Sequence, residues 1–510
     1  MESASVLFDA APGDAIETAE EPEFLGDLNL DQILASVTEG REDYVLKPYF
    51  YHPLSRPEAI AYRQAVFRDL EDRSLSDYLA MFAQQMKAMR VVLAQAEKRW
   101  YVRQKQRGFL EAVDAYGIAI GCLARDLASV ALSSQALRRF REYVIAYEQS
   151  EPFQGLVEET RELKKKLSQI EYRLEVEGPR IKVSRYESDP DYGEVIARTF
   201  EKFRQGAPHE YEFRVAARLE MNPVEAAILD RVAWLFPEVF AALEDYVARR
   251  RDFLDATISR FDRQIQFYLA YLEYVNRLKR TGLHFCYPEL NASSTEIDCR
   301  DAFDLALADK LARVPTTPVT NDVRLTGRER VLVVTGANQG GKTTFARMFG
   351  QLHYLARLGC PVPGSAAKVI LCDQLFTHFE REEDLRRLHS KLEDDLVRIH
   401  AMLAHASPRS VLVMNESFSS STLQDALYLS KAILGQIIDR GVVCIFVTFL
   451  DELSSLGPST VSFVATVRPE DPAQRTFKVV RRRADGLAYA LAMAEKHGLT
   501  YARTKQRLKA

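Results

Sequence analysis

The chain has 510 residues and a formal net charge of −4, and 47% of its side chains are apolar and 27% are charged. This length suggests roughly two to four domains, and the composition is that of an ordinary soluble globular protein. The net charge argues against a uniformly basic surface, although it leaves a local basic patch open. The six cysteines include no C-x-x-C pair, which favours reduced thiols in the cytoplasm and offers no zinc site. No signal peptide and no long apolar span is present, so we expect neither export nor membrane insertion.

Residues 1–45 are expected to be an acidic tail. The first forty residues contain no Lys or Arg, whereas Asp and Glu recur throughout them. Acidic segments of this kind often do not fold alone, so the composition predicts a largely disordered tail, or one that docks on a partner.

Residues 46–300 are expected to form a helical region, because apolar residues recur there at spacings of three and four with charges between them. The clearest segments are 76–94, 128–147 and 247–278, and the last is long enough to be a lever or a coiled-coil arm. Residues 172–186 interrupt this pattern. They alternate polar and apolar side chains around a Gly-Pro pair, which predicts a β-hairpin.

Residues 301–510 are expected to form an α/β domain. Several apolar runs alternate with helical patterns, as in strands that helices cover on both faces. The expected strands are 331–335, 368–371, 411–414, 442–448, 460–467 and 476–481. The fold expected for the whole chain is multidomain: an all-α, lever- and clamp-like N-terminal half with a small β-hairpin, followed by a P-loop α/β domain.

A phosphate-binding loop follows the first of these strands. Residues 336–344 read GANQGGKTT, which fits G-x-x-x-x-G-K-T after an apolar run. The glycines allow a tight turn whose N–H groups bind phosphate, Lys342 reaches the β- and γ-phosphates, and the Thr343 hydroxyl binds Mg²⁺. The alternative is a glycine-rich turn that binds nothing. The residues expected at the nucleotide are Gly336, Asn338, Gly340, Gly341, Lys342, Thr343 and Thr344.

A second apolar strand ends at Asn415 and Glu416, where P-loop enzymes carry a metal-binding carboxylate and a water-orienting residue. Around these residues the chain resembles the MutS family of DNA-repair ATPases. GANQGGKTT is similar to the family's G-P-N-M-G-G-K-S-T, and residues 358–385 are similar to its block that contains F-T-R-x-G-A. Residues 388–396, 415–425 and 446–453 fall on S-T-F-x-x-E-M, D-E-x-G-R-G-T-S-T-x-D-G and F-A-T-H-x-x-E-L. The resemblance covers about residues 318–500 and identifies an ATPase domain of ABC/MutS type.

The resemblance implies ATP and Mg²⁺ as ligands and a homodimer that forms through the ATPase domains. In the family, each nucleotide lies between the P-loop of one subunit and a signature serine of the other, and Ser390 falls on that serine. Ser390 would thus contact the partner's nucleotide in trans. An ordinary capping box between Ser390 and Glu393 is the alternative, and both roles are compatible. Glu416 is the expected catalytic residue, with Asn415 beside it, and Mg²⁺ is expected at Thr343 and, through water, at Asn415.

Several departures from the family pattern concern hydrolysis more than binding. Asn415 replaces the Walker-B Asp and lacks the charge that helps to retain Mg²⁺. Phe449 replaces a switch-loop His and donates no hydrogen bond, and residues 378–381 replace Arg-x-Gly-Ala with His-Phe-Glu-Arg. No aromatic residue stands near 318–321, where the family stacks the adenine. We expect ATP to bind and to be hydrolysed slowly or not at all, because losing one contact to developing charge costs about 10²–10³ in rate.

The N-terminal half departs further from the family. It shows no counterpart of the family's mismatch-reading domain, and no nuclease segment follows the ATPase domain, so mismatch recognition is not expected. A basic and aromatic run at residues 87–107 is able to hold phosphates, with Lys98, Arg99, Arg103 and Lys105 as the candidate DNA contacts. A charged helix face that is only solvated is the alternative.

These patterns and the resemblance favour a MutS-like, ATP-gated dimeric clamp that acts on DNA in repair or recombination. Two alternatives remain open. One is a fully active, DNA-dependent ATPase in which Asp373 or Glu416 compensates for Asn415. The other is a pseudo-ATPase scaffold that binds ATP and a protein partner without DNA.

Overall fold

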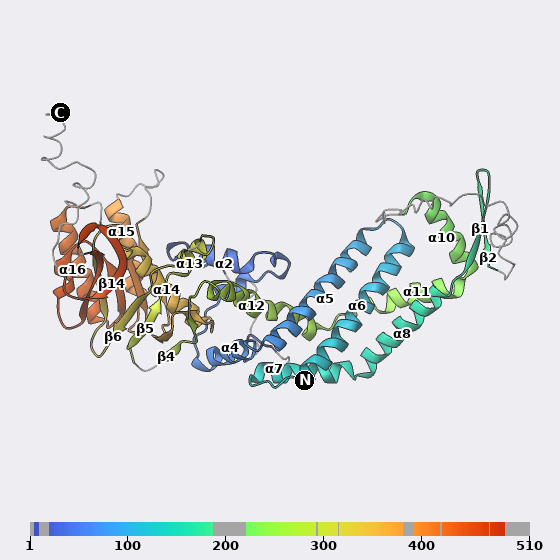
Figure 1. The fold of residues 1–510 in the computed structure, drawn as a ribbon, viewed down its shortest axis with the longest axis horizontal. Helices are drawn as coiled ribbons and strands as arrows, with labels where there is room; N and C mark the ends of the chain where they lie inside the picture. The colour runs from blue at the N-terminus through green and yellow to red at the C-terminus, as the bar shows by residue number, and fades with distance from the viewer. Residues whose placement is uncertain are drawn as a thin grey trace, which may run out of the picture. The chain divides into compact units, whose positions relative to one another are not determined.

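The computed structural model describes residues 5–9, 20–186, 221–291, 294–314, 316–380, 391–418, 421–468 and 470–484 (Figure 1). The chain folds into two compact units. Unit 1 comprises residues 1–73, 132–138 and 263–510, and unit 2 comprises residues 74–131 and 139–262. Among the described residues, no helix combines the length and the apolar content that a membrane crossing requires.

A six-stranded sheet lies at the centre of the C-terminal part of unit 1. Its strand order is β10-β11-β12-β7-β13-β14, and all neighbours are parallel except β14, which is antiparallel to β13. The strands are β7 (Val331–Gly336), β10 (Leu375–Phe379), β11 (Val411–Asn415), β12 (Val443–Val447), β13 (Thr460–Arg468) and β14 (Asp471–Arg481). Five of the six expected strands are confirmed in this sheet. The edge strand β10 is an addition.

Three helices and one 3-10 turn accompany this sheet: α14 (Lys342–Arg357), α15 (Lys391–His405), α16 (Leu423–Asp439) and η4 (Asp451–Ser455). Helices α15 and α16 pack on alternate residues of β7, β11 and β12 and form one apolar core with them. Helix α14 contacts β11 and β12. All five residues of both β11 and β12 are buried, which explains why their sequences are apolar throughout.

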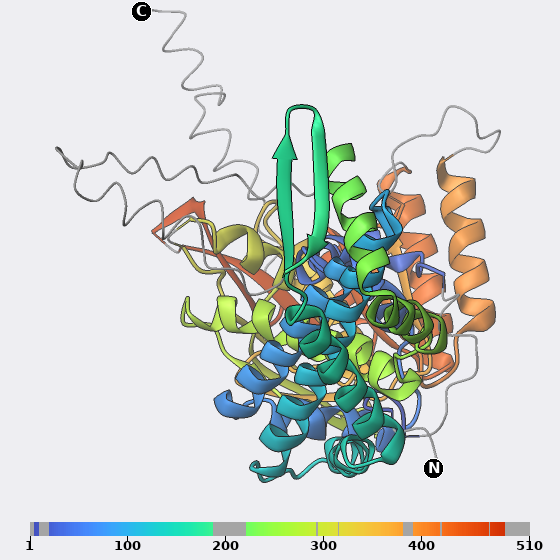
Figure 2. The same cartoon turned by 90° about the vertical axis from the view of Figure 1, so that its right-hand side faces the viewer.

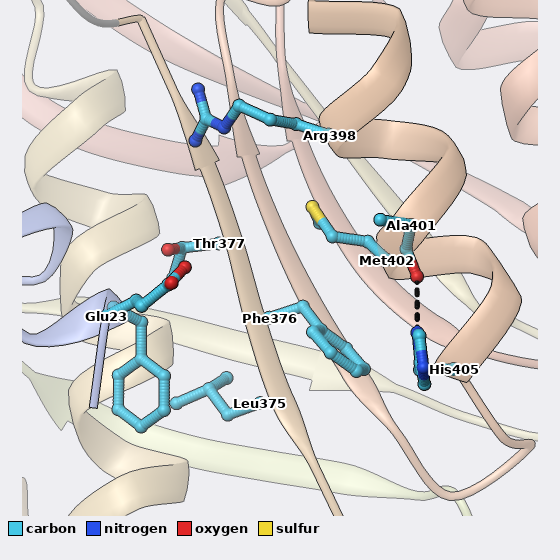
Figure 3. A pocket seen from close by; sticks show the side chains of 9 residues that line it. Glu23, Leu375, Phe376, Thr377, Arg398, Ala401, Met402 and His405 are labelled. Atoms are coloured by element: carbon cyan, nitrogen blue, oxygen red, sulfur yellow. Dashed lines mark hydrogen bonds between the residues drawn. The ribbon is translucent and has the colours of Figure 1, made fainter. Parts of the chain in front are cut away.

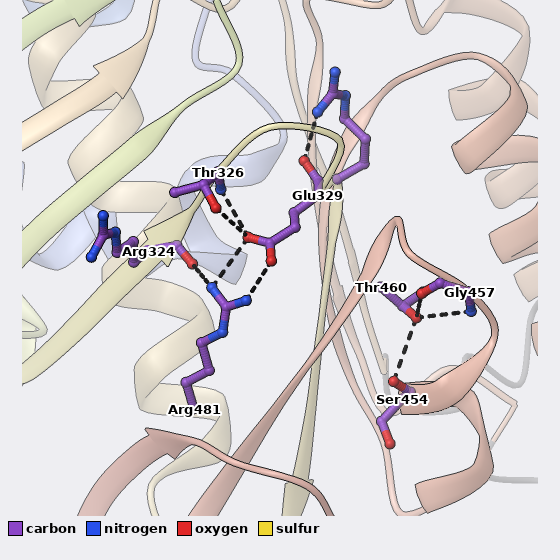
Figure 4. A network of polar contacts seen from close by, with 8 residues as sticks. Arg324, Thr326, Glu329, Ser454, Gly457, Thr460 and Arg481 are labelled. Atoms are coloured by element: carbon purple, nitrogen blue, oxygen red, sulfur yellow. Dashed lines mark hydrogen bonds and ion pairs between the residues drawn. The ribbon is translucent and has the colours of Figure 1, made fainter.

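A four-stranded sheet with the order β4-β9-β5-β6 flanks the large one in unit 1. Its strands are β4 (Glu289–Asn291), β5 (Ile297–Ala302), β6 (Asn321–Leu325) and β9 (Ala366–Ile370); β3 (Phe285–Cys286) pairs with β8 (Val362–Pro363), and α13 (Leu305–Leu311) follows β5. The strand expected at 368–371 is β9. Arg481 on β14 donates to Glu329 in the turn after β6, at 3.2 Å between Nη1 and Oε2, and so ties the two sheets together (Figure 4).

The N-terminal residues form helices within unit 1. These are α1 (Phe24–Asp27), α2 (Leu30–Thr38), the 3-10 turn η2 (Glu42–Tyr44), α3 (Lys47–Tyr51) and α4 (Pro57–Asp69). Leu25, Leu28 and Leu30 are at most 1% exposed, and a Cβ placed on Gly350 of α14 would lie 2.7 Å from Leu28 Cδ2. The prediction of a disordered acidic tail is therefore wrong for the described residues 5–9 and 20–45. The apolar residues between the acidic ones are buried against the rest of unit 1.

Unit 2 is helical and carries a β-hairpin. Its helices are α5 (Arg73–Lys98), α6 (Val102–Ala128), α8 (Glu151–Ser168), α10 (Pro223–Leu235) and α11 (Pro237–Arg249), and the hairpin is β1 (Tyr172–Glu177) and β2 (Arg180–Arg185). Helix α10 lies beside β2 (Figure 2). Helices α5 and α6 cross closely, because a Cβ on Gly108 would lie 2.5 Å from the Cβ of Ala96. The hairpin predicted at residues 172–186 is confirmed.

Two predicted helix boundaries differ from the structure. The helix expected at 128–147 begins only at Gln135, as α7 (Gln135–Glu148). The long helix expected at 247–278 is two helices, because α11 ends at Arg249 and α12 runs from Ala256 to Lys279. The Asp255 carboxylate causes the new start, since it accepts hydrogen bonds from the backbone N–H groups of Thr257 and Ile258, both at 2.9 Å. Helices α7 and α12 contribute residues to both units.

Candidate functional site

The glycine-rich loop, residues 336–341, connects β7 to α14 and requires glycine at specific positions. Gly336 and Gly341 have φ angles of +105° and +94°. A Cβ at Gly336 would lie 2.6 Å from the carbonyl oxygen of Ala465, and one at Gly340 would lie 2.8 Å from that of Ala337. Space and backbone conformation therefore select glycine, in a tight turn of the kind that forms an anion-binding concavity before a helix.

Lys342, the first residue of α14, folds back over this loop. Its side chain donates from Nζ to the carbonyl oxygens of Gly336 at 3.0 Å and Ala337 at 3.3 Å, and to Oδ1 of Asn338 at 3.0 Å. Burial lowers the pKa of Lys342, and the charge of Glu416 acts in the opposite direction. A cation held by neutral oxygens is able to exchange them for phosphate oxygens, which form stronger, charge-assisted bonds.

Asn415 and Glu416 reach the same edge of the sheet as the loop. Asn415 is opposite Val447 on β12, and Val447 is opposite Val334 on β7. The Asn415 side chain is 8% exposed, and its Oδ1 has no hydrogen-bond partner among the described residues. Glu416 has a φ of +53°, which is uncommon for a residue with a side chain and often marks functional sites. Buried oxygen atoms without partners are rare, so Asn415 Oδ1 is suited to a ligand or to water.

Arg475 and Phe477 on β14 complete the loop's surroundings, and the sequence did not indicate either residue. Arg475 donates from Nε to the carbonyl oxygen of Asn338 at 3.0 Å. Phe477 lies beside Gly341, whose Cβ would be 3.9 Å from the Cβ of Phe477. Its ring is 51% exposed, and its carbonyl accepts from Asn321 Nδ2 at 3.3 Å. Residues 318–321 have no aromatic neighbour along the chain. In the structure Phe477 lies beside Asn321, because β14 brings it there from 156 residues away.

Phe449 follows the end of β12 and is 52% exposed. The neighbouring Thr448 is buried, and its Oγ1 accepts from the backbone N–H of Leu450 at 3.0 Å. The turn is therefore held by its backbone and by Thr448, while the phenyl ring offers solvent or a ligand an apolar surface without a hydrogen-bond donor.

His378 lies where the resemblance places an arginine, and it is fully buried. Its Nδ1 is 3.0 Å from Ser417 Oγ, and its Nε2 is 3.1 Å from Asp395 Oδ1. Ser417 directly follows Glu416, and Asp395 belongs to α15. The fixed charge is thus replaced by an imidazole that joins β10, the turn after β11 and α15 through buried hydrogen bonds.

Asp373 cannot compensate for Asn415. The Asp373 carboxylate accepts from Ser410 Oγ at 2.8 Å and from Ser407, and its backbone N–H donates to Arg409. These contacts place Asp373 before the start of β11, whereas Asn415 ends that strand. At roughly 3.3 Å per residue, the length of β11 separates the two side chains.

The four expected DNA contacts in unit 2 are Lys98 at the end of α5, Arg99 in the turn after it, and Arg103 and Lys105 in the first turn of α6. Lys98 and Lys105 are exposed. The guanidinium of Arg103 lies 5.5 Å from the ring centre of Phe240 and 3.8 Å from Glu244, both in α11. Arg103 thus has a packing role within unit 2, whereas the two lysines are open to a ligand.

Ser390, the expected trans contact, lies outside the described residues, and α15 begins at the next residue. Of the other expected nucleotide contacts, Asn338 is exposed, and Thr343 and Thr344 are half-buried in the first turn of α14. The structure therefore brings the loop, Lys342, Asn415 and Glu416 to one edge of the sheet.

A cavity of about 260 Å³ lies at the β10 edge of the large sheet, between α1, α15 and this strand (Figure 3). It is lined by Glu23, Phe24, Leu375, Phe376, Thr377, Arg398, Ala401, Met402 and His405. Strands β11 and β12 lie between β10 and β7. This cavity is therefore separate from the glycine-rich loop.

Residues 332–501 match the family described as MutS domain V. The chain is 34% identical to the DNA mismatch repair protein MutS of Granulibacter bethesdensis over 28% of this chain and 15% of that protein. It is 28% identical to the DNA mismatch repair protein MutS of Syntrophobacter fumaroxidans over 44% of this chain and 24% of that protein. It is 29% identical to the DNA mismatch repair protein MSH3 of Kluyveromyces lactis over 27% of this chain and 14% of that protein.

These alignments thus cover less than a quarter of each relative's length. The domain V match begins on β7 and includes the glycine-rich loop, Asn415 and Glu416. The site described above and the similarity to known proteins therefore lie in the same part of the chain. Residues 332–501 thus resemble MutS domain V, and the chain is similar over parts of its length to DNA mismatch repair proteins of the MutS family.

Proposed function

We propose that this protein is a MutS-like, nucleotide-binding DNA-repair protein, an ATP-gated dimeric clamp on DNA with weak or absent ATP hydrolysis. The observation that carries the proposal is the glycine-rich loop with Lys342 folded onto it at the start of α14. The triphosphate would occupy the loop and replace the oxygens that Lys342 now contacts. The base would stack on the exposed ring of Phe477.

Magnesium fits this site as a partner of the nucleotide. Among the described residues no group of three or more His, Cys, Asp or Glu side chains could hold a metal ion alone. Mg²⁺ commonly binds through few protein groups together with substrate phosphates. Thr343 would offer its hydroxyl, and the unpartnered Oδ1 of Asn415 would accept a hydrogen bond from a metal-bound water. When bound, the ion would neutralise charge on the phosphates.

Weak hydrolysis follows from the charges present. Glu416 would orient the attacking water, but Asn415 supplies no negative charge and Phe449 no hydrogen-bond donor. A fully active ATPase would need compensation, and the position of Asp373 removes one of the two candidates for it. The dimer is part of the proposal because Ser390 of a second copy would complete each nucleotide site.

The first prediction concerns nucleotide binding. Lys342→Ala should weaken ATP-Mg²⁺ binding roughly 10–100-fold in calorimetry, because hydrogen bonds to charged groups are worth about 1.5–3 kcal/mol each. Lys431→Ala, on the exposed face of α16, is the matched control and should bind as the wild type does. Equal affinities for Lys342→Ala and wild type would exclude the loop as the nucleotide site.

The second prediction concerns the base. Phe477→Ala should weaken ATP binding, since stacking on an aromatic ring contributes about 1–3 kcal/mol per base. Binding of inorganic tripolyphosphate should not change, because it has no base to stack. Tyr428→Ala removes another exposed aromatic ring, on α16, and serves as the control. An equal loss for ATP and tripolyphosphate would show that Phe477 supports the loop and does not contact the base.

The third prediction concerns turnover. Asn415→Asp should accelerate ATP hydrolysis roughly 10–100-fold, the range typical of contacts around a bound metal, because it restores a negative charge next to the Mg²⁺. Adding Glu416→Gln to this variant should abolish the gain. Phosphate release under saturating ATP is the measurement. A wild-type kcat of about 1–10³ s⁻¹, the ordinary enzyme range, contradicts the proposal of a degenerate site.

The fourth prediction concerns DNA. Reversing Lys98 and Lys105 to Glu should weaken duplex binding equally for all sequences, because phosphate contacts carry no sequence information. The slope of log affinity against log salt should decrease in magnitude by about 2. Reversal of Lys165 and Lys166, exposed on α8, changes the charge equally and is the control. If wild type fails to bind DNA at low salt, or if both pairs act alike, the scaffold alternative is favoured.

A further inference from the structure

The N-terminal residues 5–9, Ser-Val-Leu-Phe-Asp, are held in unit 1 as a bound peptide is held. They belong to no helix or strand, yet Val6 and Leu7 are at most 1% exposed. Among the described residues, the segment forms its hydrogen bonds with side chains of α12, of α4 and of Arg56 just before α4. Two further bonds end on its own Ser5 hydroxyl. We call this side-chain surface the α4–α12 groove; it consists of Arg56, Tyr62, Arg63, Gln264 and Tyr268.

The groove contacts three consecutive carbonyl groups. The Ser5 carbonyl accepts from the Tyr62 hydroxyl at 2.7 Å. The Val6 carbonyl accepts from the Tyr268 hydroxyl at 2.6 Å, and the Leu7 carbonyl accepts from Arg63 Nε at 3.0 Å. Contacts to successive backbone groups, with apolar side chains buried beside them, are a common way to recognise a peptide.

Gln264 and Arg56 recognise the two ends of the segment. Gln264 Oε1 accepts from the backbone N–H of Val6 and from the hydroxyl of Ser5, both at 3.0 Å. Arg56 Nη2 lies 2.6 Å from each carboxylate oxygen of Asp9. The first contact is buried and the second is exposed, so the ion pair adds orientation more than affinity.

Three polar side chains of the groove are buried when the segment is docked. Gln264, Tyr268 and Arg63 are then at most 2% exposed. Besides the Leu7 carbonyl, Arg63 donates to the Leu358 carbonyl, and its Nη2 has no partner among the described residues. Because polar groups buried without partners are costly, a ligand that covers these side chains must bring carbonyl acceptors together with its two apolar side chains.

We propose that the α4–α12 groove is a peptide-binding site, that residues 5–9 are its resident ligand, and that the site binds this ligand through contacts alone, without the chain connection. Its ligand class is a short, bent segment with a small polar residue, two buried aliphatic residues, an aromatic residue and an acid. The occupant in the free protein is the segment of the same chain. Effective concentrations near the millimolar range, typical of short connections, keep it docked.

The experiment places a protease site within residues 10–19 and cuts the folded full-length protein. Gel filtration should show that the cut N-terminal fragment stays with the rest of the chain. A fluorescent peptide with the sequence of residues 2–10 should then exchange with the fragment and raise the anisotropy. The uncut protein should take up the same peptide at least ~10-fold less well, because its own segment competes at high effective concentration.

Variant peptides give the specificity while the protein remains wild type. Peptides carrying Val6→Asp or Leu7→Asp should bind at least ~10-fold more weakly, because a charge would enter a buried apolar position. A scrambled peptide is the control for non-specific binding. Retention of the fragment or uptake of the wild-type peptide supports the proposal. Loss of the fragment from folded protein without uptake, or equal uptake of the Val6→Asp and scrambled peptides, overturns it.

Discussion

One buried cation, Arg63 of α4, contacts the N-terminal segment, the C-terminal end of α14 and helix α12. Its side chain donates to the Leu7 carbonyl at 3.0 Å and to the Leu358 carbonyl at 3.1 Å, and its guanidinium lies 5.1 and 5.3 Å from the ring centres of Phe8 and Phe267. Burial lowers its pKa below the usual value. The two carbonyl dipoles and the two ring faces stabilise this charge. The segments that carry these groups must therefore keep their positions around Arg63. Breaking contacts of a buried charge typically costs about 3–5 kcal/mol.

The same arginine bears on the helix that starts at the nucleotide site. Leu358 caps the C-terminus of α14, whose first residue is Lys342, and the helix of 16 residues is roughly 24 Å long. At that far end the backbone N–H of Leu54 also donates to the Arg357 carbonyl at 2.9 Å. A rigid element therefore connects the proposed phosphate contact to α4 and α12. Helix α12 contributes residues to both units, so it is one of the chain segments that pass from unit 2 into unit 1.

The sequence was most informative where local chemistry determines structure. The order of strand, glycine-rich loop and helix around Gly336 follows from one motif, because space and φ exclude other residues there. Phe477 and the α4–α12 groove were missed because each depends on a contact between segments far apart in the chain. The acidic composition also concealed Val6 and Leu7, whose burial depends on α12. The break before α12 rests on one cap, Asp255, inside an apolar periodicity that continues across it.

The departures from the family pattern fall into two physical classes. At Asn415 and Phe449, a charge or a hydrogen-bond donor is lost. At His378, a fixed charge is lost, but the buried bonds to Asp395 and Ser417 keep β10, the turn after Glu416 and α15 connected. The geometry of the site is thus maintained while the groups that would stabilise developing charge are reduced. Nucleotide binding depends mainly on the first property and hydrolysis on the second, which is the physical reason for proposing a protein that holds a nucleotide and hydrolyses it weakly.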